Sequence, residues 1–545
     1  MKKFIKIFFA ICLILLVVSS CKKSFLQEKI YSNYAPETLT DSLGFEASIT
    51  GLSNLLSTWF TLDSHQGFID AWQVGTDVAF ATAAEGAEVP FYNYSTLDPT
   101  NFVGSFTWTW AYQMINNANN IITNVEKPDI VMGQANKNSI DAEAKFYRAY
   151  AYNILATLFG KVPIITQPLA APKTDFVRSS LDSVNNLIVN DLIFSAANLP
   201  DIDNVKSNSK GKMYERPNNA MAQQLLAIVY LRIGKPDLAE AQCNAIINSG
   251  KFKLITQRYG VKAGKPGDPY SDMFVYGNQR RNQGNTEAIW ILEQENPNTV
   301  VGGITQNAQQ RRNWGAAYYS VPGMKICDSL GGRGISRMRL SNWVLYGLYA
   351  DGDMRNSEYN LRRHFYYNDP APAYASKYGH PVPFDGSIDT IRFIAPHITK
   401  WYQFDPNDEF GYAMIKDFVL MRLGETYLLL AESQLKQGKL DEAASSVNVL
   451  RQRAFPDYPL HGQVHASDMT MNFILDERVR ELIGEENRRM VLMRTNTLVD
   501  RAIKLNSNSV QNPLNGLTDK NLLLPIPQSE IDLNKDAKLD QNPGY

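Results

Sequence analysis

The chain has 545 residues, of which 54 are Lys or Arg and 55 are Asp or Glu, so its formal net charge is −1. Proteins that bind nucleic acid usually carry a basic excess clustered on one face, and this balance argues against such a partner. No Gly/Ser-rich or Pro-rich linker divides the sequence, which predicts one large body rather than a row of separate domains.

The first 21 residues are typical of an export signal. Three lysines at positions 2, 3 and 6 precede an apolar stretch of 12 residues, 7–18, and two serines come just before Cys21. A helix needs about 20 apolar residues to cross a bilayer, so this stretch is too short for a stable span. Its similarity to the lipobox of bacterial lipoproteins implies cleavage after Ser20 and a lipid on Cys21. The alternative is a soluble secreted protein whose cysteine at this point is accidental.

Two helices are predicted from apolar residues that recur on one face. In residues 142–165 this face contains Phe146, Tyr150, Ile154 and Leu158, before Gly160 and Pro163 stop the helix. In residues 177–200 it contains Leu181, Val184, Ile188 and Leu192, and Pro200 closes the segment. Both faces are expected to pack into the core.

A matching pattern of small residues predicts the same helical hairpin twice. The two copies are Ala227, Leu231, Gly234 and Ala239, and Ala431, Leu435, Gly438 and Ala443. Small side chains let two helices approach closely, and glycine ends the first helix where a left-handed residue is needed. The pattern resembles tetratricopeptide repeats, whose stacked hairpins bury a continuous core. Two copies are too few for a regular solenoid.

Residues 251–411 predict loops and short strands, because they are rich in Gly, Asn, Pro, Tyr and Trp. Long irregular stretches on a rigid helical body tend to carry function. Only Cys243 and Cys327 remain once the signal and the lipid site are set aside. They could pair in an oxidising compartment or stay as two separate thiols.

Charged residues at helical spacing could suggest a catalytic cluster. The candidates are Arg422, Glu425, Glu432, Arg451, Glu477, Arg478, Glu481 and Arg488. Each acid has an arginine nearby in sequence, which favours structural ion pairs, since a raised-pKa acid needs an apolar or like-charged surrounding. A glycosidase would use two carboxylates across a sugar, for which Asp351 with Asp353 or Glu287 with Glu293 could be nominated. His461 and His465 form a poor zinc motif, and no nucleotide-binding loop is present.

Aromatic residues in irregular segments suggest a sugar site, because sugars present apolar C–H faces beside hydroxyl edges. One such stretch contains Asp70 and Asp77, and the other begins with Gln310. We expect ligand contacts from Trp72, Tyr92, Asn93, Tyr94, Arg311, Asn313, Trp314, Tyr318 and Tyr319. The strongest candidate for the sugar platform is Trp314 with Tyr318 and Tyr319, because no apolar stripe at helical spacing explains these rings as core residues. For any one aromatic the alternative is burial, and Trp108 and Trp110 are expected to pack.

The chain resembles the SusD/RagB-like outer-membrane nutrient-binding lipoproteins of Bacteroidetes, most specifically through its final segment, residues 522–545 (LLLPIPQSEIDLNKDAKLDQNPGY). Four more segments match the family's pattern at individual positions. The matching residues are Trp110, Ile115 and Asn119 in the first segment, Glu143, Arg148, Gly160 and Pro163 in the second, Arg422, Glu425, Tyr427, Ala431, Glu432, Asn448, Arg451 and Arg453 in the third, and Glu477, Arg478, Glu481, Leu482, Glu485, Arg488 and Leu492 in the fourth. The chain departs from the family pattern at Glu486 and Val491, and at Lys22 and Lys23, where surface-exported members often carry acids.

The resemblance implies a signal peptide at residues 1–20 and one SusD-like domain at residues 21–545, mainly α, with TPR-like hairpins, long irregular loops and minor β structure. It implies a lipid-anchored protein of the outer membrane that faces the cell exterior, captures oligosaccharide and delivers it to a SusC-like TonB-dependent transporter. No catalysis, cofactor or metal is expected. The alternatives are a peptide-binding RagB-like protein and, from another class, a surface glycoside hydrolase.

Overall fold

The computed structural model describes residues 39–62, 65–169, 171–207, 212–296, 308–411, 414–508 and 512–545. About 47% of the chain is helix and 6% strand, as expected for a mainly helical single body. The export segment and Cys21 lie outside the described residues. Within the described part, none of the helices combines the length and the apolar character that crossing a membrane requires.

Helices dominate both ends of the chain. Before residue 251 they are α2 (Ser42–Thr61), α3 (Phe102–Val125), α4 (Gln134–Phe159), α5 (Leu181–Asn198), α6 (Asn219–Arg232) and α7 (Pro236–Asn248). After residue 411 they are α11 (Leu423–Lys436), α12 (Leu440–Ala454), α13 (Met471–Leu482), α14 (Arg488–Arg494), α15 (Leu498–Asn506) and α16 (Gln528–Leu533). We call these helices together the helical body.

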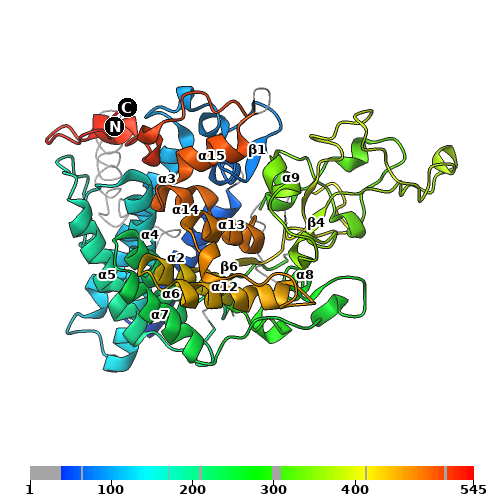
Figure 1. The fold of residues 1–545 in the computed structure, drawn as a ribbon. Helices are drawn as coiled ribbons and strands as arrows, with labels where there is room; N and C mark the ends of the chain where they lie inside the picture. The colour runs from blue at the N-terminus through cyan, green and yellow to red at the C-terminus, as the bar shows by residue number, and fades with distance from the viewer. Residues whose placement is uncertain are drawn as a thin grey trace, which may run out of the picture.

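Successive helices of the helical body pack on one another, α3 on α4, α4 on α5, α5 on α6 and α6 on α7. The two predicted hairpins are confirmed as α6–α7 and α11–α12, and they meet because α7 packs on α11 (Figure 1). Gly234 and Gly438 turn the two hairpins with φ of 73° and 75°, where a side chain would be strained. The stacked hairpins therefore form one core across sequence-distant segments.

The two other predicted helices are also confirmed. α4 ends at Gly160, whose φ is 72°, and α5 begins after Ser180, whose side chain accepts a hydrogen bond from the Ser183 amide at 3.1 Å. The expected apolar faces are buried except at two positions. Leu181 is exposed at the start of α5, and Tyr150 is half-buried on α4.

Residues 251–411, here called the loop body, lie to one side of the helical body (Figure 1). As expected they form irregular segments, short helices and short strands. The helices are α8 (Pro269–Asp272), α9 (Gln310–Trp314) and α10 (Asn342–Tyr346). The sheets each contain two antiparallel strands: β1 (Ala79–Ala81) with β3 (Met338–Leu340), β2 (Ala288–Leu292) with β6 (Phe418–Arg422), and β4 (Leu361–Arg362) with β5 (His397–Ile398). Two of these sheets join the loop body to segments outside it.

The last residues of the chain close the end of α4. Asn542 Nδ2 donates to the Phe159 carbonyl at 3.0 Å and to the Leu524 carbonyl at 2.7 Å. The Leu524 amide donates to the Leu158 carbonyl at 2.6 Å. These donors satisfy carbonyls that a helix terminus leaves without partners, so the distinctive final segment has a structural role.

The two cysteines do not form a disulfide. Cys243 is buried on α7, while Cys327 is half-buried in the loop body, and both are free thiols. Of the two alternatives that the sequence left open, the structure contains separate thiols.

Candidate functional site

Exposed aromatic side chains gather in the loop body. Within the described part of the chain, every aromatic residue among the exposed large hydrophobic residues lies between positions 276 and 410. Their exposed fractions run from 43% to 62%, and they are Tyr276, Tyr346, Tyr359, Tyr366, Tyr378, Phe384 and Phe410. Rings that face water beside hydrogen-bonding groups suit a ligand with apolar faces and hydroxyl edges.

Tyr319, Arg333 and Phe410 form the best-defined of these surfaces, which we call the Phe410 platform. The Phe410 ring is 62% exposed and meets the Tyr319 ring edge to face, with 6.2 Å between ring centroids and 84° between planes. Arg333 Nη1 donates to the Phe410 carbonyl at 2.7 Å, and its Nε lies 3.4 Å from the Tyr319 hydroxyl. An accessible ring face thus lies next to a hydroxyl and a guanidinium.

Two of the predicted ligand residues, Arg311 and Tyr318, are buried and position the segments that form this platform. Arg311 is buried and donates to the Gln403 carbonyl at 3.1 Å and to the Gly411 carbonyl at 2.6 Å, so it fixes the segment that carries Phe410. Tyr318 is buried too, and its hydroxyl donates to the Gly332 carbonyl at 2.9 Å, next to Arg333. Of the predicted second stretch, Tyr319 is the aromatic that reaches the surface.

The aromatics of the first predicted stretch pack inside the molecule. Trp72 stacks on Trp59 with 5.1 Å between ring centroids and 19° between planes. The Tyr94 hydroxyl donates to the Gly75 carbonyl at 3.0 Å and accepts from Arg489 Nη1 at 2.7 Å. These side chains present no ring face to solvent, and we withdraw them as platforms for a surface ligand. The expectation that Trp108 and Trp110 pack in the core is confirmed.

The two predicted stretches do meet, but below the surface. Trp314 is 2% exposed and belongs to the same buried cluster as Tyr92. Asn313 Nδ2 donates to Asp70 Oδ1 at 3.0 Å, which links one stretch to the other. Asn93 is half-buried. Trp314 is therefore not accessible as a platform at the surface, because a buried indole cannot stack on a ligand there.

Sequence reasoning missed Arg333 and Phe410. Phe410 is the single aromatic in an acidic, turn-rich segment, residues 405–411, with no periodic pattern to assign it to a face. Whether a side chain in such a segment is exposed depends on long-range contacts, such as the hydrogen bonds that Arg311 donates. No pattern in the local sequence reveals these contacts. Its isolation between charged residues and glycine is the one feature that could have marked it.

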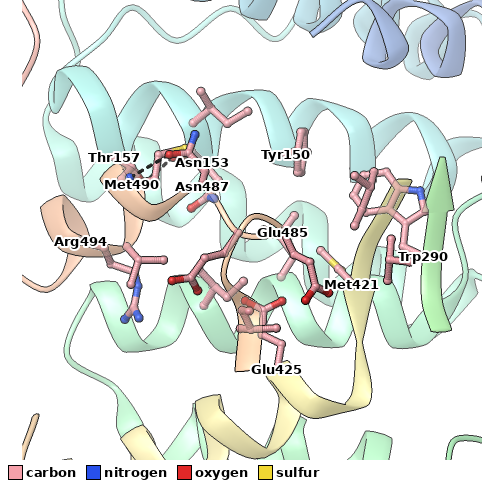
Figure 2. Close-up of a pocket in the computed structure, with 18 of the residues that line it drawn as sticks. Tyr150, Asn153, Thr157, Trp290, Met421, Glu425, Glu485, Asn487, Met490 and Arg494 are labelled. Carbon is pink, nitrogen blue, oxygen red and sulfur yellow. Dashed lines mark hydrogen bonds between the residues drawn. The ribbon is translucent and has the colours of Figure 1, made fainter. Parts of the chain in front are cut away.

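A half-enclosed cavity of about 170 Å³ lies between α4, β6, α11 and α14 (Figure 2). Trp290 and Tyr150 form apolar walls, and Glu425 and Glu485 line it. Glu425 accepts from Arg478 Nη2 at 2.8 Å. A neighbouring cavity of about 70 Å³ contains Trp72 and Trp314 in its wall. Because the acids in these walls are neutralised by arginine, the cavities offer no free acid for catalysis.

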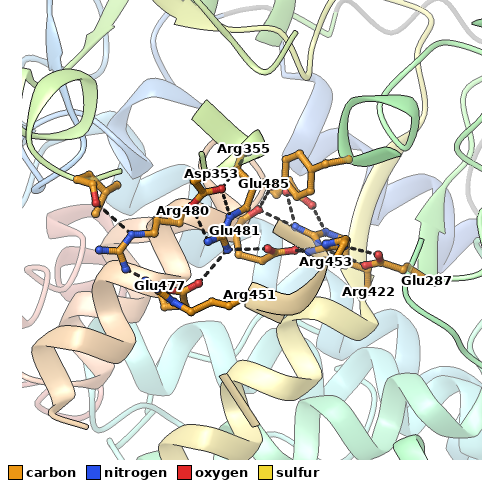
Figure 3. Close-up of polar contacts among 12 residues, drawn as sticks. Glu287, Asp353, Arg355, Arg422, Arg451, Arg453, Glu477, Arg480, Glu481 and Glu485 are labelled. Atoms are coloured by element: carbon orange, nitrogen blue, oxygen red, sulfur yellow. Dashed lines mark hydrogen bonds and ion pairs between the residues drawn. The ribbon is translucent and has the colours of Figure 1, made fainter. Parts of the chain in front are cut away.

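Buried charges join several elements in one ion-pair network (Figure 3). Arg422, at the end of β6, pairs with Glu287 at 3.2 Å, Glu481 at 2.6 Å and Glu485 at 2.7 Å. Arg453 of α12 pairs with Glu287 at 2.5 Å and also with Glu481. Strand β2, strand β6 and helices α12 and α13 are therefore linked through charge as well as through apolar packing.

The same network reaches the loop body through Arg355. This side chain pairs with Asp353 at 2.8 Å, Glu477 at 2.9 Å and Glu481 at 3.1 Å (Figure 3). Arg451 of α12 pairs with Glu477 from another side at 3.0 Å. Two acids of α13 thus sit between the helical body and the loop body.

The electrostatics of this network confirm the structural interpretation of the acidic residues. Burial alone would raise the pKa of Glu477, but Arg355, Arg451 and Arg480 outweigh it and lower that pKa to about 2. Burial acts in the same direction on Glu481, yet its arginine neighbours hold its pKa well below the usual range. A general acid needs a raised pKa, so these residues are unsuited to that role.

Several of the nominated catalytic and metal residues are engaged elsewhere, whereas Asp351 is exposed. Asp353 pairs with Arg355, and Glu293 accepts from two backbone amides, at 2.9 and 2.6 Å. His461 contacts Asp457 at 2.5 Å. In the described ranges, no three His, Cys, Asp or Glu side chains are grouped so that they could hold a metal ion.

A second buried charge group differs because acids outnumber cations. Arg337 Nε lies 3.2 Å from Asp70 Oδ2 and 2.8 Å from Glu88 Oε1, and both acids are fully buried. Burial and the charge of Asp70 raise the pKa of Glu88 to about 8, although Arg337 acts against them. Burial also raises the pKa of Asp70. Asp70 and Glu88 together therefore hold a proton at neutral pH. Asp70 also accepts the hydrogen bond from Asn313 that links the two predicted stretches.

Two family models match the chain. One, described as the SusD family, matches residues 385–545, and one described as "Starch-binding associating with outer membrane" matches residues 25–231. The SusD-like protein P2 of Formosa agariphila is 26% identical over 571 residues, which cover 100% of both chains.

Solved structures share the fold along nearly the whole chain. A laminarin-binding SusD-like protein has a TM-score of 0.66 and 22% identity, and the match covers 93% of this chain and 100% of that one. Surface glycan-binding protein A from Bacteroides thetaiotaomicron, in complex with laminarihexaose, has a TM-score of 0.68 and 18% identity over 92% of this chain and 100% of that one. The expectation of a SusD-like fold is confirmed.

We predict that Glu481→Gln destabilises the protein by about 3 to 5 kcal/mol, because it leaves buried arginines without their shared counter-charge. Urea unfolding followed by circular dichroism measures this change. Lys538→Gln removes a surface ion pair with Asp540 and should leave the unfolding midpoint unchanged. Equal midpoints for Glu481→Gln and the wild type would contradict the role given to the network.

We predict that Glu88 contributes a loss of stability as the pH rises from about 4.5 to about 8, because this side chain keeps its proton in the folded state and loses it in the unfolded state. Glu88→Gln removes this proton and should reduce the fall by an amount on the order of 2 kcal/mol. Unfolding midpoints at pH 5 and pH 8 measure the effect. Glu442→Gln, at an exposed site on α12, should keep the wild-type pH dependence, and a slope unchanged by Glu88→Gln would disprove the assignment.

Proposed function

Because this chain belongs to the SusD/RagB family, we propose that it is a non-catalytic surface protein that captures oligosaccharide through the aromatic face of its loop body. Glycan-binding proteins of this family are non-catalytic. The observation that carries the proposal is the Phe410 platform, where an accessible ring adjoins a tyrosine hydroxyl and an arginine.

The chemistry of the platform fits a sugar ring. Axial C–H groups of a pyranose can lie on the Phe410 face, while the Tyr319 hydroxyl and the Arg333 guanidinium lie at the ring edge, where sugar hydroxyls need partners. The two rings stand at 84°, so they form a notch rather than a flat plate. Further exposed rings on the same loop body could contact neighbouring sugars of a chain.

The comparisons favour oligosaccharide over the two alternatives. A similar structure contains laminarihexaose, and another is described as laminarin-binding. A peptide site would need backbone-directed donors and side-chain pockets more than exposed rings. A glycoside hydrolase would need two free carboxylates across the sugar, whereas Glu287 and Glu293 are both paired, and Asp353, which was nominated together with the exposed Asp351, pairs with Arg355.

Attachment and delivery complete the proposal. A lipid on Cys21, which lies outside the described residues, would hold the protein at the outer membrane, facing the cell exterior. The description of one matching family model, which includes association with the outer membrane, supports this location. The helical body would then cover a SusC-like TonB-dependent transporter as a rigid lid that carries the aromatic face. Weak binding suffices in such an assembly, because tethering raises the local concentration of captured polymer.

We predict that Phe410→Ala combined with Tyr319→Ala weakens oligosaccharide binding at least about tenfold, since stacking and ring burial are both lost. Calorimetry against a panel of polysaccharides, with laminarin included, measures the change. Phe410 is exposed and Tyr319 is only partly buried, so the fold should persist. Leu460→Ala removes an exposed apolar side chain outside the loop body and serves as the matched control. Binding that survives the double change would remove the platform from the site.

We predict that Cys21→Ala releases the protein from membranes without unfolding it, because only the attachment point of the lipid is lost. Fractionation of cells into membrane and soluble pools, followed by circular dichroism of the released protein, measures both effects. The same membrane fraction shows whether a TonB-dependent transporter co-purifies with the wild type. Persistent membrane attachment of the variant would show that the anchor lies elsewhere.

A further inference from the structure

Arg339 of β3 is a buried cation without an acidic partner. It is 7% exposed, and it forms no ion pair within 4.0 Å with a carboxylate in the described part of the chain. Its Nη1 donates to the Leu340 carbonyl at 3.1 Å and to Asn342 Oδ1 at 3.0 Å, while its Nε has no hydrogen-bond partner. Burial lowers the pKa of Arg339, and the nearby Tyr346 opposes this effect. A buried charge in this condition costs free energy unless something neutralises it.

Arg339 lines a pocket of about 300 Å³, which is at the lower end of the range for small-ligand sites. The pocket is built from β1, β3, α10, the end of α15 and residues 390–391 of the loop body. It therefore lies at the boundary between the helical body and the loop body, and Figure 1 shows β1 and α15 beside each other there. Among the described residues of its wall, Arg339 is the single charged one.

The orientation of the guanidinium is fixed by the sheet. Phe80 of β1 lies opposite Arg339 in the antiparallel register, and the guanidinium carbon lies 5.6 Å from the Phe80 ring centroid. Nη1 donates to Leu340 and Asn342, and Tyr346 contributes a further side-chain hydrogen bond, so Nε is the buried nitrogen of this guanidinium that has no hydrogen-bond partner. A planar guanidinium edge matches the spacing of two oxygens in a carboxylate or a sulfate group.

The remaining wall supplies groups that suit a sugar. Asn342, Thr390 and Ser507 offer amide and hydroxyl groups, while Phe80 and Ile391 offer apolar surface. We propose that this pocket binds the anionic substituent, a carboxylate or a sulfate ester, of an acidic sugar residue. The proposal rests on glycan capture as the function, and it narrows the ligand to glycans that carry negative charge.

The test uses four probes with the full mature protein: D-glucuronate, glucose 6-sulfate, glucose and inorganic sulfate. Calorimetry at low salt should show one or both sugar anions binding at least tenfold more tightly than glucose and than inorganic sulfate, and the two sugar anions distinguish carboxylate from sulfate ester. Arg339→Gln should weaken this binding at least tenfold. Lys504→Gln, which removes the same charge from an exposed site on α15, should leave it unchanged.

Three results would overturn the proposal: glucose binding as tightly as the sugar anions, inorganic sulfate alone accounting for the affinity, or binding that survives Arg339→Gln. Should Arg339→Gln fail to fold, Ser507→Trp fills the pocket from its exposed wall while Arg339 is retained, and it should abolish the same binding. Neutral oligosaccharides keep the two proposals apart. If they bind in a manner that depends on Phe410 while no sugar anion binds, the acidic-sugar pocket fails and glycan capture stands. If no glycan of either kind binds, glycan capture fails as well.

Discussion

Neutralising the carboxylates of α13 is the constraint on which the rest of the structure depends. Glu481 is fully buried and is contacted by three arginines, one from β6, one from α12 and one from the loop body. The arginine of the loop body is distant in sequence from the other two, and all three segments must reach their places before the charge is satisfied. Apolar packing tolerates small shifts in the positions of side chains. A buried carboxylate that loses an arginine partner becomes an uncompensated charge in the interior, which strongly destabilises the fold. The network therefore sets how the irregular loop body sits on the regular helical body.

That arrangement explains how a weakly structured region can carry a defined site. The described part of the loop body contains only short strands and helices, and hydrogen bonds from arginine side chains to backbone carbonyls position its surface. Arg311 holds Gln403 and Gly411, and Arg333 holds the carbonyl of Phe410 itself. Arginine has five donors in a rigid fork, which lets one side chain fix several loop segments. Recognition groups can then vary at the surface while the supports remain in place.

Helices α4 and α5, the two hairpins and the structural role of the acidic residues could be predicted from sequence, because each leaves a periodic signal. Ala227 and Ala431 repeat one spacing, and Glu477, Glu481 and Glu485 another. The accessible site could not be predicted in the same way. Trp314 looked available because it lacks a helical stripe, yet it belongs to a buried cluster with Tyr92 and other residues distant in sequence. Whether an aromatic in an irregular segment faces water, or an arginine such as Arg339 lacks a partner, depends on contacts that only the folded chain defines.

The pinning of α4 by the end of the chain has a consequence for the order of assembly. Carbonyls at the end of this helix are satisfied by Leu524 and by Asn542, the latter 383 positions beyond Phe159. Synthesis from the N-terminus can form α4 early, but these carbonyls gain their partners only after residues 524 and 542 have been made. Closure of this helix end is therefore a late, long-range step of folding, although the helix itself forms from local contacts.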